Sequence, residues 1–544
     1  MTSPTGQARS VRWLRWPLLV LGLALLTRAP VFVYPYFLKD EPTYSTLAVA
    51  MLEGRPLYVE AVDHKPPAIS ATYALIHALF GTYRLHPVHA VSILVVALTA
   101  LLITAAARRW GLESRASRLA GLLYLLFSVV GPGKDMLTAN AELFMLLPTA
   151  GAVLLYLLAR PRAAPGPKTP GAALLLVAAG ALGGLAFLYK YQGGAVLGTL
   201  CCLELARSWR HPGRLLGVLL AIGVGVALVI GGVVLWYWHL DEQAALAFWA
   251  WTYPLHYSGL LTTGEILRNA LVMTPQWAGP CLALLVTAAW GVWRLGCSRP
   301  VTGPGPAPAA PPPRAVLLLG LLWLLWGLVG VAAGGRFFLH YYLQALPGLA
   351  VLAAPVWCEV LSGQHGRRWR QVLVVGAIGP VIAFGVANVA DHRIRPHVAA
   401  AVEAHRTIGE WVAAHSTPAE KVFVWGNSPE IHHFSGRGLG TRFPFTNYHS
   451  GKIWGTIADE EGAPDAVLIP CPEAWPMLLA DLDRRRPALI VDAAAAGLER
   501  WRGHAATRYP ELATRLARDY RQVATVAGAP IYRRRETISS SPAP

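Results

Sequence analysis

The chain has 544 residues, of which 54% are hydrophobic and only 14% are charged, and its mean hydropathy is +0.42. Soluble domains carry about 25% charged residues, so this composition excludes an ordinary soluble protein and indicates an integral membrane protein. The formal net charge is +17. Because the Lys and Arg residues collect in short loops between apolar segments, this surplus indicates membrane topology and not a nucleic-acid partner.

Apolar segments long enough to span a bilayer recur along the first 390 residues and predict an α-helical polytopic protein with about eleven transmembrane helices. The first segment lacks a small-residue cleavage site, which indicates a retained helix and not a signal peptide. The predicted spans are residues 13–36, 87–107, 117–131, 142–159, 171–189, 191–206, 215–238, 270–293, 315–333, 341–361 and 371–390.

The basic residues of the connecting loops alternate along the chain. Loops of one parity hold most of them, for example Arg108, Arg109, Arg115 and Arg118, whereas the loops of opposite parity are longer and hold fewer. The positive-inside rule therefore places the N-terminus in the cytoplasm and the loop 37–86 outside. The Pro- and Gly-rich stretches 163–170 and 300–314 are expected to be extended cytoplasmic linkers.

The composition changes after about residue 391, where charge rises and long apolar runs end. The segments 421–425 and 488–492 predict short buried strands, and 393–415 and 510–526 predict amphipathic helices. We therefore expect a transmembrane core over 1–390 and a small extracytoplasmic α/β domain over 391–544. Only one cysteine falls in this second part, so no disulfide pair and no CxxC metal site is expected there.

The outer loop 37–86 carries ionisable residues directly beside a predicted span, where such residues are candidates for function. Asp40 and Glu41 open the loop, and an acid near an apolar wall can have its pKa raised and act as a general base. Their alternative role is to cap a following helix. Lys65 precedes Pro66-Pro67, which fixes the backbone; a cation held there suits a lipid phosphate, whereas a lysine reaching toward headgroups is the alternative.

The order of residues in this loop resembles the membrane glycosyltransferases of the C-type fold. It is similar to the bacterial lipid A aminoarabinose transferases and the protein O-mannosyltransferases, glycosyltransferase families 83 and 39. Residues 184–190 and 340–347 resemble later segments of the same families, so the resemblance covers residues 13 to about 390. It rests on Asp40-Glu41, Tyr44, Ala48-x-x-Met51-Leu52-x-Gly54, Tyr58, Lys65-Pro66-Pro67 and Phe80-Gly81.

The resemblance implies a hexosyl- or pentosyltransferase that takes a sugar from a polyprenyl-phosphate donor in the bacterial plasma membrane. It implies transfer, with inversion, to a lipid, glycan or protein hydroxyl outside the cytoplasm. Asp40 matches the catalytic aspartate and Glu41 would support it. Lys65 matches the lysine that contacts the donor phosphate, and Arg336 and then Lys190 are the next candidates for that contact.

Three further residues, Glu142, Asp135 and His64, are candidates for binding. Glu142 fits a second acidic site of the family that faces the same cavity; Asp135 is its competitor, and either residue could instead cap the following helix. His64 stands where the aminoarabinose branch has an acidic residue that helps to bind a metal. A lone histidine is usually no ligand, so we predict no protein-bound metal here; a divalent ion recruited by the donor phosphate is the alternative.

Two other classes of function are alternatives to a glycosyltransferase with a polyprenyl-phosphate donor. A flippase or transporter of lipid-linked sugars would be expected to show inverted repeats and charged residues at mid-membrane depth. A glycan ligase or polymerase with a diphosphate-linked donor would be expected to have its key outer loop late in the chain.

The aromatic residues between 236 and 257 are expected to form an interfacial belt, with the lining of a sugar or prenyl site as the alternative.

Overall fold

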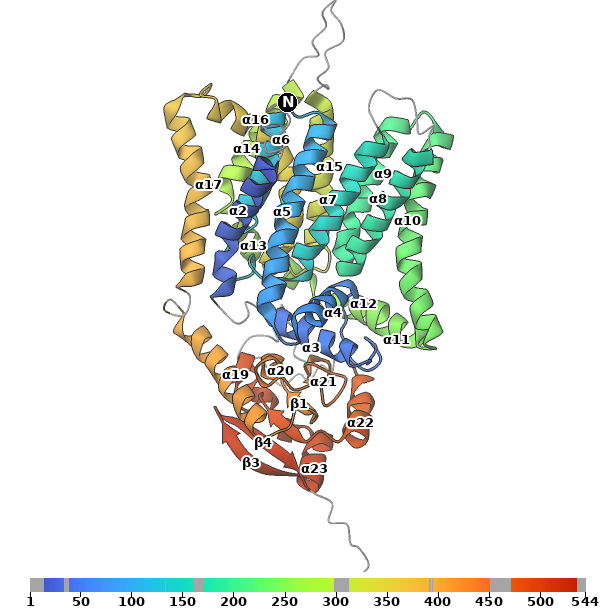
Figure 1. Ribbon diagram of the computed structural model, residues 1–544, viewed down its shortest axis with the longest axis vertical. Helices are drawn as coiled ribbons and strands as arrows, with labels where there is room; N and C mark the ends of the chain where they lie inside the picture. The colour runs from blue at the N-terminus through green and yellow to red at the C-terminus, as the bar shows by residue number, and fades with distance from the viewer. Residues whose placement is uncertain are drawn as a thin grey trace, which may run out of the picture.

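The computed structural model describes residues 14–33, 39–132, 134–160, 170–297, 313–390, 393, 395–450 and 471–535. The two expected linkers lie outside these residues, apart from their last positions. The chain forms a bundle of long helices with a small α/β domain at one end (Figure 1). The N-terminal end of the described chain lies at the opposite end of the bundle.

The bundle follows the predicted order of spans. Its first half consists of α2 (Arg15–Arg28) with η1 (Ala29–Phe32), α5 (Leu85–Trp110), α6 (Ser114–Phe127), α7 (Ala141–Ala159), α8 (Pro170–Tyr189), η2 (Tyr191–Gly194), α9 (Ala195–Ser208) and α10 (Pro212–His239). After the short α11 (Gln243–Ala247), the π-helical turn η3 (Phe248–Thr252) and α12 (Tyr253–Gly259), it continues with α13 (Thr263–Ala278), α14 (Leu282–Cys297), α15 (Pro313–Ala332), η4 (Leu339–Ala345), α16 (Leu346–Leu361) and α17 (Gly366–Val389).

The prediction of a polytopic helical membrane protein is confirmed. Within the described residues, eight helices are long and apolar enough to cross a membrane, and the pair α13 and α14, bent by 91°, counts as a ninth crossing if it is one span. The other two predicted spans are helical but short, since α6 and α9 have 14 residues each.

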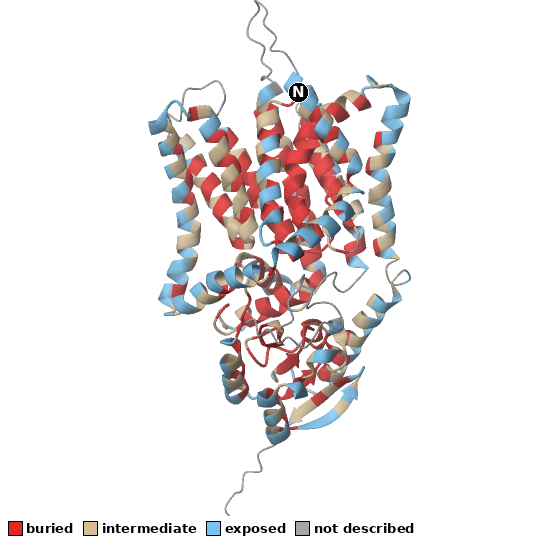
Figure 2. Ribbon diagram, turned by 180° about the vertical axis from the view of Figure 1, so that it is seen from behind, coloured by how far each residue is buried: buried red, intermediate tan, exposed pale blue. Residues whose placement is uncertain are grey.

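Burial follows the position of each helix in the bundle. The apolar window of α7 is 78% buried and that of η4 with α16 is 83% buried, whereas α10 and α17 are 17% buried. Figure 2 shows the buried residues concentrated in the central helices and the exposed ones along the outer helices. The exposed apolar faces of α10 and α17 therefore fit contact with lipid chains.

Close packing of α8 against α10 depends on two glycines. A Cβ atom at Gly180 would lie 2.0 Å from the carbonyl oxygen of Ile222, and one at Gly225 would lie 1.9 Å from that of Val177. Any side chain at these positions would force the two backbones apart, which is the usual reason for small residues at helix contacts in membranes.

The C-terminal part contains a four-stranded sheet in the order β1-β2-β4-β3, with β1 parallel to β2 and the other pairs antiparallel. The predicted strands 421–425 and 488–492 correspond to β1 (Val422–Trp425) and β2 (Leu489–Asp492). The other elements are α19 (Pro396–Ala414), α20 (Glu430–Ser435), α21 (Asn447–Ser450), α22 (Ala474–Arg485), η6 (Leu498–Arg500), η7 (Arg502–His504), η8 (Ala506–Arg508), α23 (Pro510–Asp519), β3 (Tyr520–Val526) and β4 (Ala529–Arg534).

The predicted helix 510–526 is wrong in its second half. The helix α23 ends at Asp519, and Tyr520–Val526 forms the edge strand β3. Ala527 and Gly528 both have positive φ, which closes a tight hairpin between β3 and β4. Most side chains of Tyr520–Val526 are exposed, so the segment has only a weak helical pattern of buried positions. Backbone pairing with β4 therefore decides its structure.

The outer loop lies between the bundle and the C-terminal part (Figure 1). It contains α3 (Asp40–Leu52) and α4 (Ala68–Phe80), which pack against each other. The backbone amide of Val62 donates to the carbonyl of Arg442 over 2.7 Å. The Arg55 guanidinium donates to the carbonyls of Leu439 and Thr441 over 3.0 and 3.1 Å. The C-terminal part therefore holds the loop in place.

Candidate functional site

Asp40 and Lys65 form the centre of the candidate site. Asp40 is the first residue of α3, where a negative charge is favoured by the helix dipole. The Lys65 ammonium donates to Asp40 Oδ1 over 3.0 Å and to the Tyr44 hydroxyl over 2.8 Å. Tyr44 lies one turn after Asp40, so the sequence of α3 supplies both partners of the lysine.

The position of Lys65 is fixed from its backbone. The Tyr58 hydroxyl donates to the Lys65 carbonyl over 2.7 Å. Tyr58 itself has φ 68, so the loop backbone is left-handed where it presents this side chain. The following Pro66 and Pro67 restrict the chain further and lead directly into α4.

Electrostatics keep the Asp40 carboxyl ionised. Burial alone would raise its pKa, but the charges of Lys65 and His340 and the hydrogen bond from Lys65 outweigh burial and lower the pKa below its ordinary 3.8. Burial likewise opposes the charge of Lys65, yet Asp40 and Tyr44 raise the pKa of this ammonium well above 10.5. The expected raised pKa of Asp40 is therefore absent in the pair, because a cation faces the carboxylate.

Glu41 does not lie beside Asp40 in the open part of the site. It is fully buried, and it accepts the backbone N–H of Ala139 over 2.7 Å while His89 Nε2 lies 3.3 Å from both carboxylate oxygens. These contacts fasten the start of α3 to α5 and to the loop before α7. The contacts of Glu41 therefore suit a residue that positions Asp40.

A second cluster joins the remaining predicted acids. The His340 ring lies 3.4 Å from Asp135 through Nδ1 and 3.4 Å from Glu142 through Nε2. Lys190 forms an ion pair with Glu142 and lies 4.0 Å from the centre of the Tyr341 ring. Glu142 and Asp135, considered above as competitors, thus belong to one cluster, and His340 connects them.

His340 belongs to the segment 340–347 that resembles the family, but the sequence did not predict that it lies in the site. It lies in η4, about 200 residues after Glu142 in the chain, and the sequence alone gives no distance between these elements. The signal that could have found it is the run of polar and aromatic residues at 340–344 just before the apolar helix α16.

Arg336 and His64 meet around an aromatic group. The Arg336 guanidinium lies 4.1 Å from the centre of the Tyr257 ring. His64 packs against Tyr257 and Tyr253 with ring centroids 5.0 and 5.8 Å apart, and its Nδ1 lies 3.1 Å from the Tyr448 hydroxyl. The aromatic residues between 236 and 257, expected as an interfacial belt, are divided: Trp236 and Trp238 are exposed, whereas Trp249 and Tyr253 are buried. Both buried rings pack against Tyr448 of the C-terminal part.

The pKa of His64 reflects the charges of the three cations predicted to bind the donor phosphate. Burial lowers its pKa to about 3, and the charges of Lys65, Arg336 and Lys190 act in the same direction. All three predicted phosphate ligands therefore lie within electrostatic range of one imidazole. A neutral His64 can donate one hydrogen bond through one ring nitrogen and accept one through the other, and Asp63 Oδ1 lies 3.5 Å from its Nδ1.

Residues 64–238 match the family described as dolichyl-phosphate-mannose-protein mannosyltransferase. No curated protein matches the chain significantly.

Among solved structures, ArnT from Cupriavidus metallidurans bound to undecaprenyl phosphate is 16% identical, with a TM-score of 0.60 over 95% of this chain and 97% of that one. Its apo state gives the same identity and TM-score over 96% and 98% of the two chains. The oligosaccharyltransferase AglB from Archaeoglobus fulgidus is 12% identical, with a TM-score of 0.49 over 96% of this chain and 74% of that one. The similarity to ArnT shows that this chain shares its fold, in agreement with the fold class expected from the sequence.

Proposed function

We propose that this protein is a glycosyltransferase that moves a sugar from a polyprenyl-phosphate donor to an acceptor hydroxyl on the extracytoplasmic side of the bacterial plasma membrane. The observation that carries the proposal is the pairing of Lys65 with Asp40 in one loop beside the bundle, within electrostatic range of Arg336 and Lys190. The ArnT structure with undecaprenyl phosphate supports the class of donor.

Asp40 acts on the acceptor. The acceptor oxygen attacks the anomeric carbon, its proton passes to the Asp40 carboxylate, and the bond from the anomeric carbon to the phosphate oxygen breaks with its electrons kept by the leaving polyprenyl phosphate. One displacement at this carbon inverts its configuration. Because the pKa of Asp40 is low in the free protein, the carboxylate is available as a proton acceptor at neutral pH.

Lys65 acts on the donor and, through Asp40, on the acceptor. A leaving phosphate monoester has a second pKa of about 6, so it departs without a strong general acid but needs positive charge around it. When a donor phosphate draws Lys65 away from Asp40, the carboxyl loses the cation that holds its pKa down, and burial then raises this pKa. Donor binding would therefore make Asp40 a stronger base at the moment when the sugar is in place.

The second cluster positions a further cation. Glu142 pairs with Lys190, and His340 fixes Glu142 against Asp135. Lys190 is held in this way, and Arg336 is held over the Tyr257 ring. Together with Lys65 they supply three positioned cations for the donor phosphate, so little side-chain freedom is lost on binding. We assign phosphate binding to Lys65, Arg336 and Lys190, and positioning to Glu41, Glu142, Asp135 and His340.

The arrangement favours transfer over transport. Asp40 is the first residue of α3, Glu142 lies in the first turn of α7 and Lys190 follows the last residue of α8, so each lies at or next to the end of a helix. A transporter would be expected to place such residues at mid-membrane depth. The acceptor would then approach from the side of the C-terminal part, where lipid headgroups, glycans and protein hydroxyls are all accessible.

The test is turnover of a panel of polyprenyl-phosphate pentoses, hexoses and amino sugars by the protein in lipid, with an envelope extract as acceptor. Released polyprenyl phosphate is quantified. Asp40→Asn keeps the size of the side chain but removes the base, and we expect the rate to fall by about 10³-fold. Glu53→Gln, an acid of the same loop that pairs with Lys421, is the matched control and should retain the rate.

Equal turnover in wild type and a folded Asp40→Asn variant would refute the role of Asp40. No turnover with any donor, together with movement of the lipid-linked sugar between leaflets, would refute the transferase itself.

A further inference from the structure

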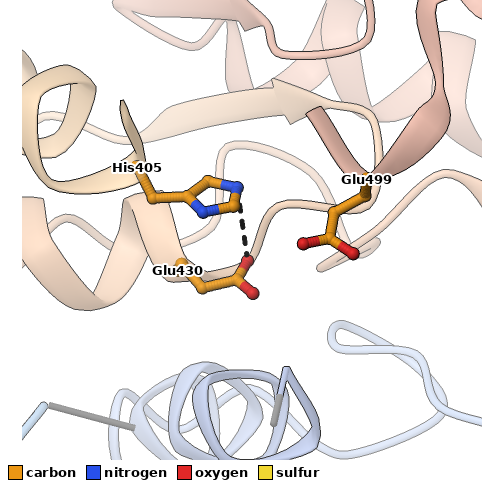
Figure 3. Close-up of side chains that lie close together, drawn as sticks. All are labelled: His405, Glu430 and Glu499. Carbon is orange, nitrogen blue, oxygen red and sulfur yellow. Dashed lines mark ion pairs between the residues drawn. The ribbon is translucent and has the colours of Figure 1, made fainter. Parts of the chain in front are cut away.

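Outside the candidate site, three potential metal ligands converge in the C-terminal part. His405 lies on α19, Glu430 is the first residue of α20 and Glu499 lies in η6. One ligand atom from each residue lies within 4.8 Å of the others, and among the described residues this is the group of three that meets this condition. Figure 3 shows the imidazole of His405 and the two carboxylates turned toward one space.

The group is not a surface patch of acids. His405 and Glu430 are 0% and 1% exposed, and Glu430 Oε2 has no hydrogen-bond partner. His405 Nε2 lies 3.9 Å from this oxygen, too far for a hydrogen bond, and 3.1 Å from the Ser428 hydroxyl. A buried carboxylate oxygen without a donor is costly, and a cation in front of it removes that cost.

We propose that His405, Glu430 and Glu499 bind a divalent transition-metal ion of the Zn²⁺ type. An imidazole together with two carboxylates suits such an ion better than Mg²⁺ or Ca²⁺, which prefer oxygen ligands alone. Around a tetrahedral Zn²⁺, ligand atoms lie about 3.3 Å apart. The present separations exceed that value by up to about 1.5 Å, which rotation of the two glutamate side chains can close.

The site borders the catalytic loop. Lys39, which directly precedes Asp40, forms an ion pair with Glu499, and α20 packs against α3. An ion bound to Glu499 would compete with Lys39 for this carboxylate while it ties α19, α20 and η6 together. The inference is independent of the donor chemistry, because it concerns ligands in the C-terminal part and its test measures metal and not sugar transfer.

The test uses the full chain in lipid nanodiscs, stripped with a chelator and then dialysed against micromolar Zn²⁺. Bound zinc is measured by mass spectrometry, and the unfolding temperature is recorded with and without Zn²⁺. We expect wild type to hold one more Zn²⁺ per chain than Glu430→Gln and His405→Ala. We also expect Zn²⁺ to raise the unfolding temperature of wild type alone, by about 2–4 °C.

Two controls keep the test informative. Glu410→Gln changes an exposed acid of the same helix and should leave the zinc content unchanged. Lys39→Met removes the competing cation and should tighten Zn²⁺ binding by about tenfold. If His405→Ala fails to fold, the nearly isosteric pair Glu430→Gln and Glu499→Gln decides the question.

X-ray absorption of the zinc-loaded protein should show nitrogen and oxygen ligands without sulfur. Wild type that holds no Zn²⁺, or a Glu430→Gln/Glu499→Gln double variant that holds as much as wild type, would overturn the proposal.

Discussion

At the scale of single residues, the environment of each charged side chain in the site is set by the residues that pair with it. Asp40 and Lys65 neutralise each other, whereas Glu41, next to Asp40 in the chain, is turned into the protein to meet Ala139 and His89. Two adjacent carboxylates thus have different surroundings, which is the basis for the different roles that we propose for them. The helical start of α3 explains this, because successive residues of a helix point about 100° apart.

Lys65→Met tests the coupling between the two charges. Without the cation, burial dominates and raises the pKa of Asp40, so the acid limb of kcat/KM should move from below 3.8 toward neutral pH. We also expect the rate at neutral pH to fall by about 100-fold, because the leaving phosphate loses a ligand. Transfer rates measured from about pH 5 to pH 8 check both effects.

Lys65→Arg keeps the charge and is the control; its acid limb should stay where that of wild type is. An unchanged pH profile in Lys65→Met would show that Lys65 does not control the proton affinity of Asp40.

At the scale of elements, close contacts between helix backbones fix the position of α10 in the bundle. The contact of α8 with α10 leaves no room for a Cβ at Gly180 or Gly225. Since α10 is otherwise exposed to lipid along most of its length, this contact fixes its position in the bundle. Packing of this kind replaces the hydrophobic effect, which does not drive helices together inside a bilayer.

Gly225→Leu should therefore separate α10 from α8. We expect the free energy of unfolding to fall by about 3 kcal/mol or more, since the clash is with backbone atoms that cannot rotate away. Thermal unfolding of the purified protein, with the monodisperse fraction recovered in detergent, measures the effect. Gly223→Leu is the matched control, because a Cβ there meets no atom within 4 Å. Equal losses in both variants would show that bulk alone, and not this contact, is responsible.

At the scale of the whole molecule, the C-terminal part completes the outer loop. Arg55 donates to the carbonyls of Leu439 and Thr441, and Glu60 forms ion pairs with Arg484 and Arg485. The hydroxyl of Tyr448 lies against His64, next to Lys65. The loop 37–86 therefore has its conformation set from both sides, by the bundle and by the C-terminal part.

Arg55→Met should loosen this connection. It removes the hydrogen bonds to three carbonyl groups, those of Leu439, Thr441 and Glu60, which costs about 1–3 kcal/mol in the local stability of the loop. Protease cleavage of the segment 52–62 should become about tenfold faster, since a tenfold change in the open population corresponds to about 1.4 kcal/mol. Arg84→Met changes an exposed arginine of the same loop and should have no such effect. A loop as resistant as that of wild type would argue against control by the C-terminal part.

The sequence by itself determined the membrane class, the order of the helices and the loop that holds Asp40 and Lys65. These features depend on local composition: long apolar runs must form helices in lipid, and Asp40 and Lys65 lie in the one polar stretch between the first two of these runs. The strands at 422–425 and 489–492 were predictable for the same reason, as short apolar runs between polar segments.

Only the tertiary structure decided how distant residues meet. His340 joins Asp135 and Glu142 from a later helix, and Tyr448 reaches His64 from the C-terminal part. The strand β3 replaced the second half of a predicted helix because β4 supplies backbone partners that no local pattern encodes. Such contacts follow from packing between elements far apart in the chain, and their energies depend on burial and distance, which a linear sequence does not contain.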